Sequence, residues 1–147
     1  MKVTNLKLLA TSDEDLRVVA AHLQDSIVSI QDIASLKKNR IFLIQLNRFM
    51  WEDVEKGVFR KNKRIRTVLK FDNVISVVSK NINKKENKNF LDFLTIASNL
   101  LPDKSYEIKL IFSGDVVIKI KTEVIDVTLD DQGSPWESKT QPKHNFL

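Results

Sequence analysis

The spacing of hydrophobic residues near the N-terminus predicts one amphipathic helix. Four apolar residues recur at intervals of three or four and so share one helical face: Leu16, Val19, Ala20 and Leu23. Ser12 stands just before this stretch, and an acid follows three residues later, as at a helix N-cap. We therefore expect a helix that begins after Ser12, ends near Asp25 and lies on the core.

Beyond residue 26 the pattern changes to the alternation of apolar and polar residues that is typical of half-buried strands. Strands are predicted for residues 5–9, 27–36, 41–49, 64–78, 106–112 and 116–129. The two longest strands each lose their alternation midway, near Asp72 and near Glu123, which indicates a bulge or a turn. Residues 90–101 fit either a strand or a helical face.

The sequence also contains an internal similarity. Residues 33–46 are similar to residues 96–110, and residues 68–77 are similar to residues 118–127 in the same relative order, if residues 49–63 are an insertion in the first copy. Two copies of a three-strand unit point to one β-rich domain that closes on itself.

The expected fold is therefore α+β: a single, mostly antiparallel β domain, closed or barrel-like, with one N-terminal amphipathic helix. The domain covers residues 1–133, with copy one at about 26–80 and copy two at about 90–130. After Gly133 the composition becomes polar, so residues 134–147 are expected to form a loose tail.

Composition places the chain among globular domains without a membrane helix or disulfides. The 147 residues are 42% hydrophobic and 29% charged, and none is cysteine. No apolar run approaches the ~20 residues that span a bilayer, and the N-terminus lacks the features of a signal peptide. We expect a cytoplasmic protein with no cofactor, no metal site and no membrane partner.

The net charge of +5 is unevenly spread. Residues 56–70 carry seven cations and no acid, and residues 80–88 carry a net +3, so the rest of the chain is mildly acidic. Such segments could collect an anionic partner, although charge runs often mark solvated loops.

Few residues suggest catalysis. The two histidines, His22 and His144, have no recognisable catalytic partner in sequence, and there is no Gly-x-Ser-x-Gly motif or phosphate-binding glycine loop. We therefore predict no catalytic residues and treat an enzyme as a weaker hypothesis than a binding protein.

One polar and aromatic segment stands out at the end of a predicted strand. Loops on a rigid sheet often carry binding groups. The candidate ligand or partner site consists of Asn47, Arg48, Phe49, Trp51 and Glu52, with Trp136 beside it. In the alternative interpretation, Phe49 and Trp51 belong to the core and Arg48 forms a surface salt bridge with Glu52.

Four motifs together resemble a known family. They are His22-Leu23-Gln24-Asp25, Asp32-Ile33-Ala34, Asn47-Arg48-Phe49-x-Trp51-Glu52 and Gly133-x-Pro135-Trp136. In this order they are similar to small bacterial proteins known only as a domain of unknown function, and the resemblance spans about residues 6–144. It implies a stand-alone bacterial protein of the cytoplasm without an assigned activity.

Two functional hypotheses follow. The first is a non-enzymatic binding or adaptor domain that holds an unknown protein or a small ligand with the Asn47–Glu52 segment and an exposed strand edge. The second is a nucleic-acid-associated module that uses the basic 56–70 segment. Its phosphate contacts would be Arg60, Lys61, Lys63, Arg64 and Arg66.

Overall fold

The structure of the protein is a computed structural model that describes residues 5–51, 63–82 and 90–137. Its helices are α1 (Asp13–Leu23) and two single-turn 3₁₀ helices, η1 (Ile30–Asp32) and η2 (Lys37–Asn39). Its strands are β1 (Lys7–Ala10), β2 (Ile27–Ser29), β3 (Ile33–Leu36), β4 (Ile41–Phe49), β5 (Lys63–Phe71), β6 (Val74–Lys80), β7 (Phe90–Leu100), β8 (Tyr106–Phe112), β9 (Val117–Thr122) and β10 (Val127–Glu137).

The predicted N-terminal helix is confirmed as α1. Its N-cap is Ser12, whose hydroxyl oxygen accepts a hydrogen bond of 3.1 Å from the backbone N–H of Asp15. The four residues of the predicted apolar face, Leu16, Val19, Ala20 and Leu23, are all buried. The helix therefore forms because a cap satisfies its first turn and one face joins the core.

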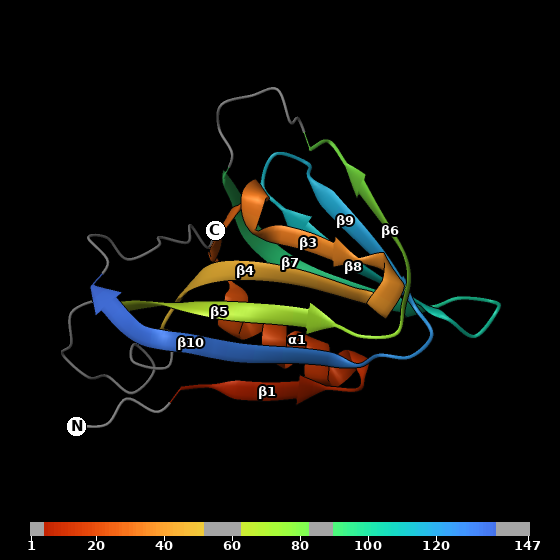
Figure 1. Ribbon diagram of the computed structural model, residues 1–147, viewed down its shortest axis with the longest axis horizontal. Coiled ribbons are helices and arrows are strands. Elements are labelled where there is room, and N and C mark those ends of the chain that lie inside the picture. The colour runs from red at the N-terminus through yellow and green to blue at the C-terminus, as the bar shows by residue number, and fades with distance from the viewer. Residues whose placement is uncertain (1–4, 52–62, 83–89, 138–147) are drawn as a thin grey trace, which may run out of the picture.

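The strands form one strongly curved antiparallel sheet (Figure 1). Their order is β1-β10-β5-β4-β2-β7-β8-β9-β6. β3 is not part of this order and pairs with β4. Phe90–Leu100, which the sequence left open, is strand β7. The inner face of the sheet carries the core, in which the ring centroids of Phe42 and Phe71 lie 5.9 Å apart.

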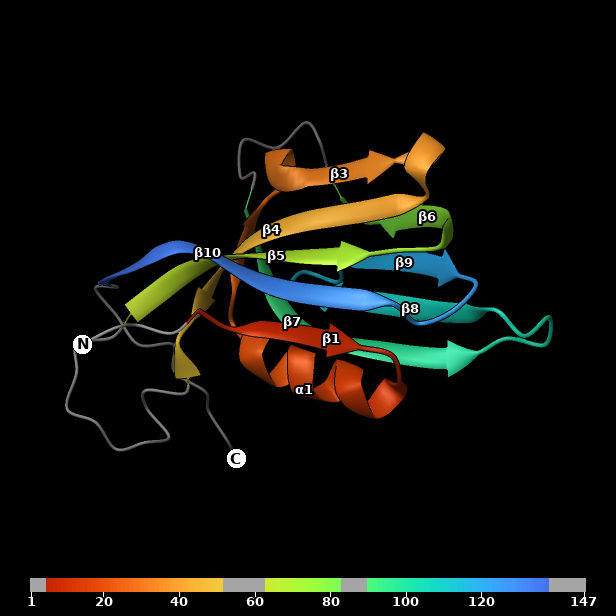
Figure 2. The same cartoon turned by 60° about the horizontal axis from the view of Figure 1, so that its bottom comes forward.

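The prediction of a closed, barrel-like α+β domain is wrong. The sheet is open, because β1 and β6 stand at its two ends and each hydrogen-bonds with one strand among those described. Helix α1 lies against both β1 and β7, with its apolar face buried in the core (Figure 2). The described residues form a mostly antiparallel β structure with α1 as their one α-helix.

The irregularities at Asp72 and Glu123 mark places where the chain changes its pairing partners. The first long predicted strand divides into β5 and β6, and the second divides into β9 and β10. One half of the sheet contains β1, β10, β5 and β4, and the other contains β7, β8, β9 and β6. β5 lies in the first half and β6 in the second, whereas β9 lies in the second half and β10 in the first. Each long predicted strand therefore crosses from one half to the other at its irregularity. That copy one and copy two are sequence repeats stays a prediction.

The last described strand extends beyond the expected domain end at Gly133. β10 continues to Glu137, and Trp136 pairs in register with Arg64 of β5 after an irregularity between Gln132 and Trp136. Of the predicted tail, residues 134–137 therefore belong to the sheet, and residues 138–147 lie outside the described residues.

Replacing the helix cap tests how α1 is held. We expect Ser12→Ala to lower the free energy of unfolding by about 1 kcal/mol, since the Asp15 amide loses its acceptor. Ser12→Asp supplies another acceptor and should retain most of the stability. Urea denaturation of both variants, with the exposed Ser79→Ala on β6 as control, measures the effect. Equal losses in Ser12→Ala and Ser79→Ala would contradict the assigned cap.

Candidate functional site

Four residues of the sequence-predicted site, Arg48, Phe49, Trp51 and Trp136, form what we call the corner, and Arg48 and Phe49 are buried in it. Arg48 and Asp131 form a two-bonded ion pair, with Nε–Oδ1 at 2.8 Å and Nη2–Oδ2 at 2.7 Å. Both side chains are only 1% exposed. The backbone N–H of Leu6 donates a further hydrogen bond of 2.8 Å to Asp131 Oδ2. This geometry satisfies two charges that would otherwise be costly to bury.

The pair follows from the alternation of the strands that carry it. Arg48 continues the buried row Phe42, Ile44 and Leu46 of β4, and Asp131 continues the buried row Val127 and Leu129 of β10. β5 lies between these two strands. The alternative of a surface ion pair is wrong in its placement of Arg48, which is buried; Glu52 lies outside the described residues.

The aromatic residues of the corner pack against the end of α1. The rings of Phe49 and Trp51 meet edge to face with centroids 4.7 Å apart, and Trp51 Nε1 donates to the backbone oxygen of Gln24 at 2.9 Å. Phe49 is fully buried, whereas Trp136 is 41% exposed. The corner therefore joins α1, β4 and β10, and Trp136 is its most accessible aromatic group.

Arg64 also contacts the residues of the corner. Its Nη1 donates to the backbone oxygens of Asp25 and Asn47 at 3.2 and 3.1 Å, and its Cζ lies 5.8 Å from the centroid of the Phe49 ring. Burial lowers the pKa of the guanidinium, and the carboxylates of Asp25 and Asp92 partly offset this. Arg64 thus has a structural role that the basic pattern did not indicate.

The predicted phosphate-binding set is only partly described. Arg60 and Lys61 lie outside the described residues. Lys63 is half-buried, and Arg66 is exposed on the outer face of β5. The three described members of the set, Lys63, Arg64 and Arg66, therefore differ in how far they are exposed.

Sequence reasoning missed a groove between β3 and β6. It has a volume of about 700 Å³. Its lining comes from β3 and η2 on one side and from β6 on the other, with Glu123 at one end: Ser35, Leu36, Lys37, Arg40, Ile41, Val74, Ile75, Ser76, Val77 and Glu123.

One end of the groove is held together by hydrogen bonds. The backbone N–H of Val74 donates to the Arg40 oxygen at 2.9 Å, and Arg40 Nε donates to the Val74 oxygen at 3.2 Å. Arg40 Nη2 also lies 2.7 Å from Glu123 Oε1. A left-handed φ of 58° at Arg40 ends η2 and turns the chain into β4.

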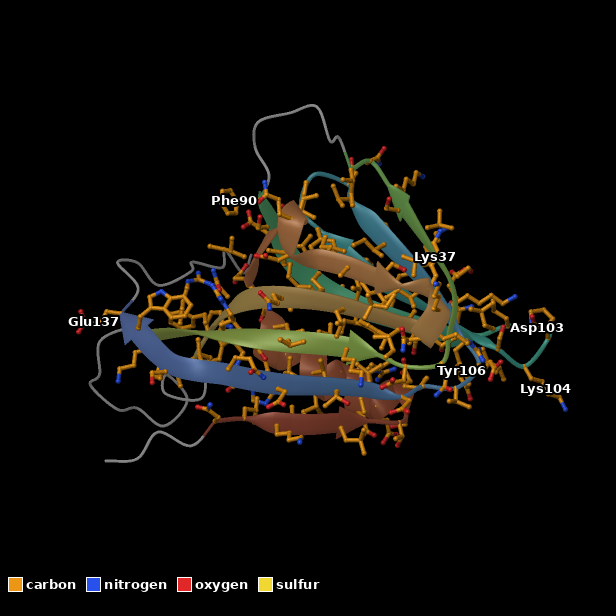
Figure 3. The ribbon with its side chains drawn as sticks, in the orientation of Figure 1. Lys37, Phe90, Asp103, Lys104, Tyr106 and Glu137 are labelled. Carbon is orange, nitrogen blue, oxygen red and sulfur yellow. The ribbon has the colours of Figure 1, made fainter. Side chains whose placement is uncertain are left out.

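The groove and the buried corner lie at opposite ends of the molecule. Lys37 of the groove and Glu137, the neighbour of Trp136 in sequence, are far apart along the long axis (Figure 3). One sequence signal for the groove existed: Val74 and Ile75 are adjacent apolar residues, so one of them must leave the core face. Ile75 does so, with 48% of its surface exposed.

Removing one partner of the Arg48–Asp131 pair should be strongly destabilising. We expect Asp131→Asn to lower the free energy of unfolding by about 3–5 kcal/mol, because a buried guanidinium loses its countercharge. The matched control is Asp130→Asn, one residue away on the opposite face of β10, with an expected change within about 0.5 kcal/mol.

A double variant separates charge from packing. Arg48→Met combined with Asp131→Leu should be less destabilised than Asp131→Asn alone, since no charge stays buried. Urea denaturation of the wild type, Asp131→Asn, Asp130→Asn and the double variant provides the comparison. Equal stabilities of Asp131→Asn and Asp130→Asn would show that the pair does not hold the sheet.

The described residues contain no group of three or more histidine, cysteine or acidic side chains that could hold a metal ion. None of the helices in this part of the chain is long and apolar enough to cross a membrane. Searches of the curated proteins and of the solved structures each found no significant match. A family described as "Protein of unknown function (DUF2948)" matches residues 6–144, and the chain belongs to this family.

Proposed function

We propose that the chain is a non-enzymatic binding domain that holds an extended segment of a partner protein in the β3–β6 groove. Two strand edges beside the groove carry this proposal. Among the described strands, β3 hydrogen-bonds only with β4, and β6 only with β9. An edge strand presents unpaired backbone N–H and C=O groups, and an extended peptide can add to it as a further strand.

The side chains around the groove suit such a partner. Leu36 and Ile75 face the space from opposite sides and are 44% and 48% exposed. Their apolar surface supplies binding energy to a peptide that covers it.

The lining favours binding over catalysis. Ser35 and Ser76 contribute hydroxyl groups, but a serine nucleophile needs a nearby base. Glu123 is the one carboxylate in the described lining, and Arg40 holds it in an ion pair. This arrangement supports recognition of a main chain and its side chains.

The second hypothesis, nucleic-acid binding, stays a prediction, and so does a ligand site at the Asn47–Glu52 segment with Trp136. The carbonyl contacts of Arg64 and the burial of Arg48 and Phe49 favour structural roles for these residues. A bacterial source and a cytoplasmic location are likewise predictions.

Peptide selection on the whole chain tests the proposed function. A displayed library of random peptides of about ten residues, roughly 33 Å when extended, is long enough to follow either edge. We expect enriched peptides whose binding weakens about tenfold in Ile75→Asp, because a charge replaces an apolar contact in the groove. The control is Leu9→Asp on β1, where Leu9 is 64% exposed.

Two further measurements define the outcomes. Amide chemical shifts of the labelled chain should change at residues 35–37 and 74–77 when a selected peptide is added. Equal weakening in Ile75→Asp and Leu9→Asp, or no enriched peptide at all, would refute the proposal. Titration with single-stranded RNA at about 50 and 300 mM salt examines the second hypothesis, whose affinity should fall steeply with salt.

A further inference from the structure

The β3–β6 groove has an uneven charge distribution. Two cations, Lys37 and Arg40, belong to its lining, together with one acid, Glu123. All three lie at the η2 end of the groove, where the hydrogen bonds between Arg40 and Val74 join the two sides. This end therefore carries a net positive charge beside the exposed apolar residues Leu36 and Ile75.

Arg40 is held in position but stays accessible. Its left-handed backbone and the bond from Nε to the Val74 oxygen fix the guanidinium over the start of β6. The side chains of Arg40 and Glu123 are 44% and 56% exposed, so solvent reaches their ion pair. A partner carboxylate can approach the same guanidinium from the side that is exposed to solvent.

Glu123 differs from Arg40 in how it is fixed. Its backbone N–H donates to the Asn73 oxygen at 3.0 Å, which holds the main chain. Among the described residues, the ion pair with Arg40 is the one polar contact of its side chain. The carboxylate can therefore rotate away from the groove without disturbing the strands.

We propose that the extended segment bound in this groove carries an Asp or Glu side chain that replaces Glu123 on Arg40, with Lys37 as the second cation. This inference rests on the proposed function and gives it a ligand chemistry: an apolar segment with one carboxylate. Glu123 acts as an internal competitor that occupies the guanidinium in the free protein.

The energetics of exposed ion pairs make this exchange feasible. Such a pair is worth little in water, so the replacement of one carboxylate by another is nearly neutral. Affinity then comes from the added strand and the apolar contacts, and selectivity for an acidic segment comes from the added attraction between its carboxylate and Lys37. A segment without an acid leaves Glu123 in place and gains no new ion pair.

The test uses the whole chain and the random peptide library. Peptides selected on the wild-type protein should carry Asp or Glu at one preferred position. Each selected peptide is then compared with its Asn or Gln counterpart by fluorescence polarisation. Glu123→Gln should bind the acidic peptides about two- to fivefold more tightly, the range expected when one exposed ion pair no longer competes, and the amide counterparts unchanged.

Two lysine variants isolate the contribution of the second cation. Lys37→Gln should weaken the acidic peptides and leave the amide counterparts unchanged. Lys38→Gln is the matched control, since Lys38 is exposed in the same turn but does not line the groove. Thermal denaturation checks that every variant is folded.

The outcomes distinguish the two proposals. Enriched peptides without an acidic preference, or unchanged affinities in Glu123→Gln, would overturn the carboxylate exchange and leave the binding groove standing. No enriched peptide would overturn both. An acidic preference that Lys38→Gln reduces as strongly as Lys37→Gln would show nonspecific attraction to a basic turn, and this also counts against the exchange.

Discussion

A buried ion pair links two strands that are not neighbours in the sheet. Arg48 on β4 and Asp131 on β10 join across β5, and both charges are shielded from water. A one-residue slip of either strand would turn its charge to the outer face and break the ion pair in the core. The pair therefore fixes the register of three strands at once. The corner around it, with Phe49, Trp51 and Arg64, depends on that register.

The groove is a consequence of how the chain distributes its strands. β10 enters the half that contains β4 and β5, and β6 enters the half that contains β8 and β9. The sheet bends so far that β3 and β6 border one groove without pairing. Arg40 ties the two sides at one end only. An open sheet thus keeps two unpaired edges next to each other, an arrangement that a closed barrel would eliminate.

Local features of the fold could be read from the sequence, whereas the neighbours of each strand could not. The Ser12 cap and the apolar spacing of α1 act within a few residues, and the structure confirms both. Alternation along a strand indicates which face of the sheet a residue occupies, but it does not indicate which other strands pair with that strand. The breaks near Asp72 and Glu123 predict a bulge or a turn within one closed domain, but they do not show that the chain changes its pairing partners there. Arg48 was assigned to a ligand site or to a surface salt bridge with Glu52, although its place after Phe42, Ile44 and Leu46 marks the buried face.

The pairing of β1 with β10 also determines when the sheet can be completed. Residues 7–10 pair with residues 127–130, so the first strand has no described strand partner until the last one is present. Asp131, the countercharge of Arg48, comes from the same late segment. Until β10 emerges from the ribosome, β5 lacks one of its two pairing strands and Arg48 lacks the carboxylate of Asp131. Completion of the sheet follows emergence of β10, and contacts so distant in sequence make for slow folding.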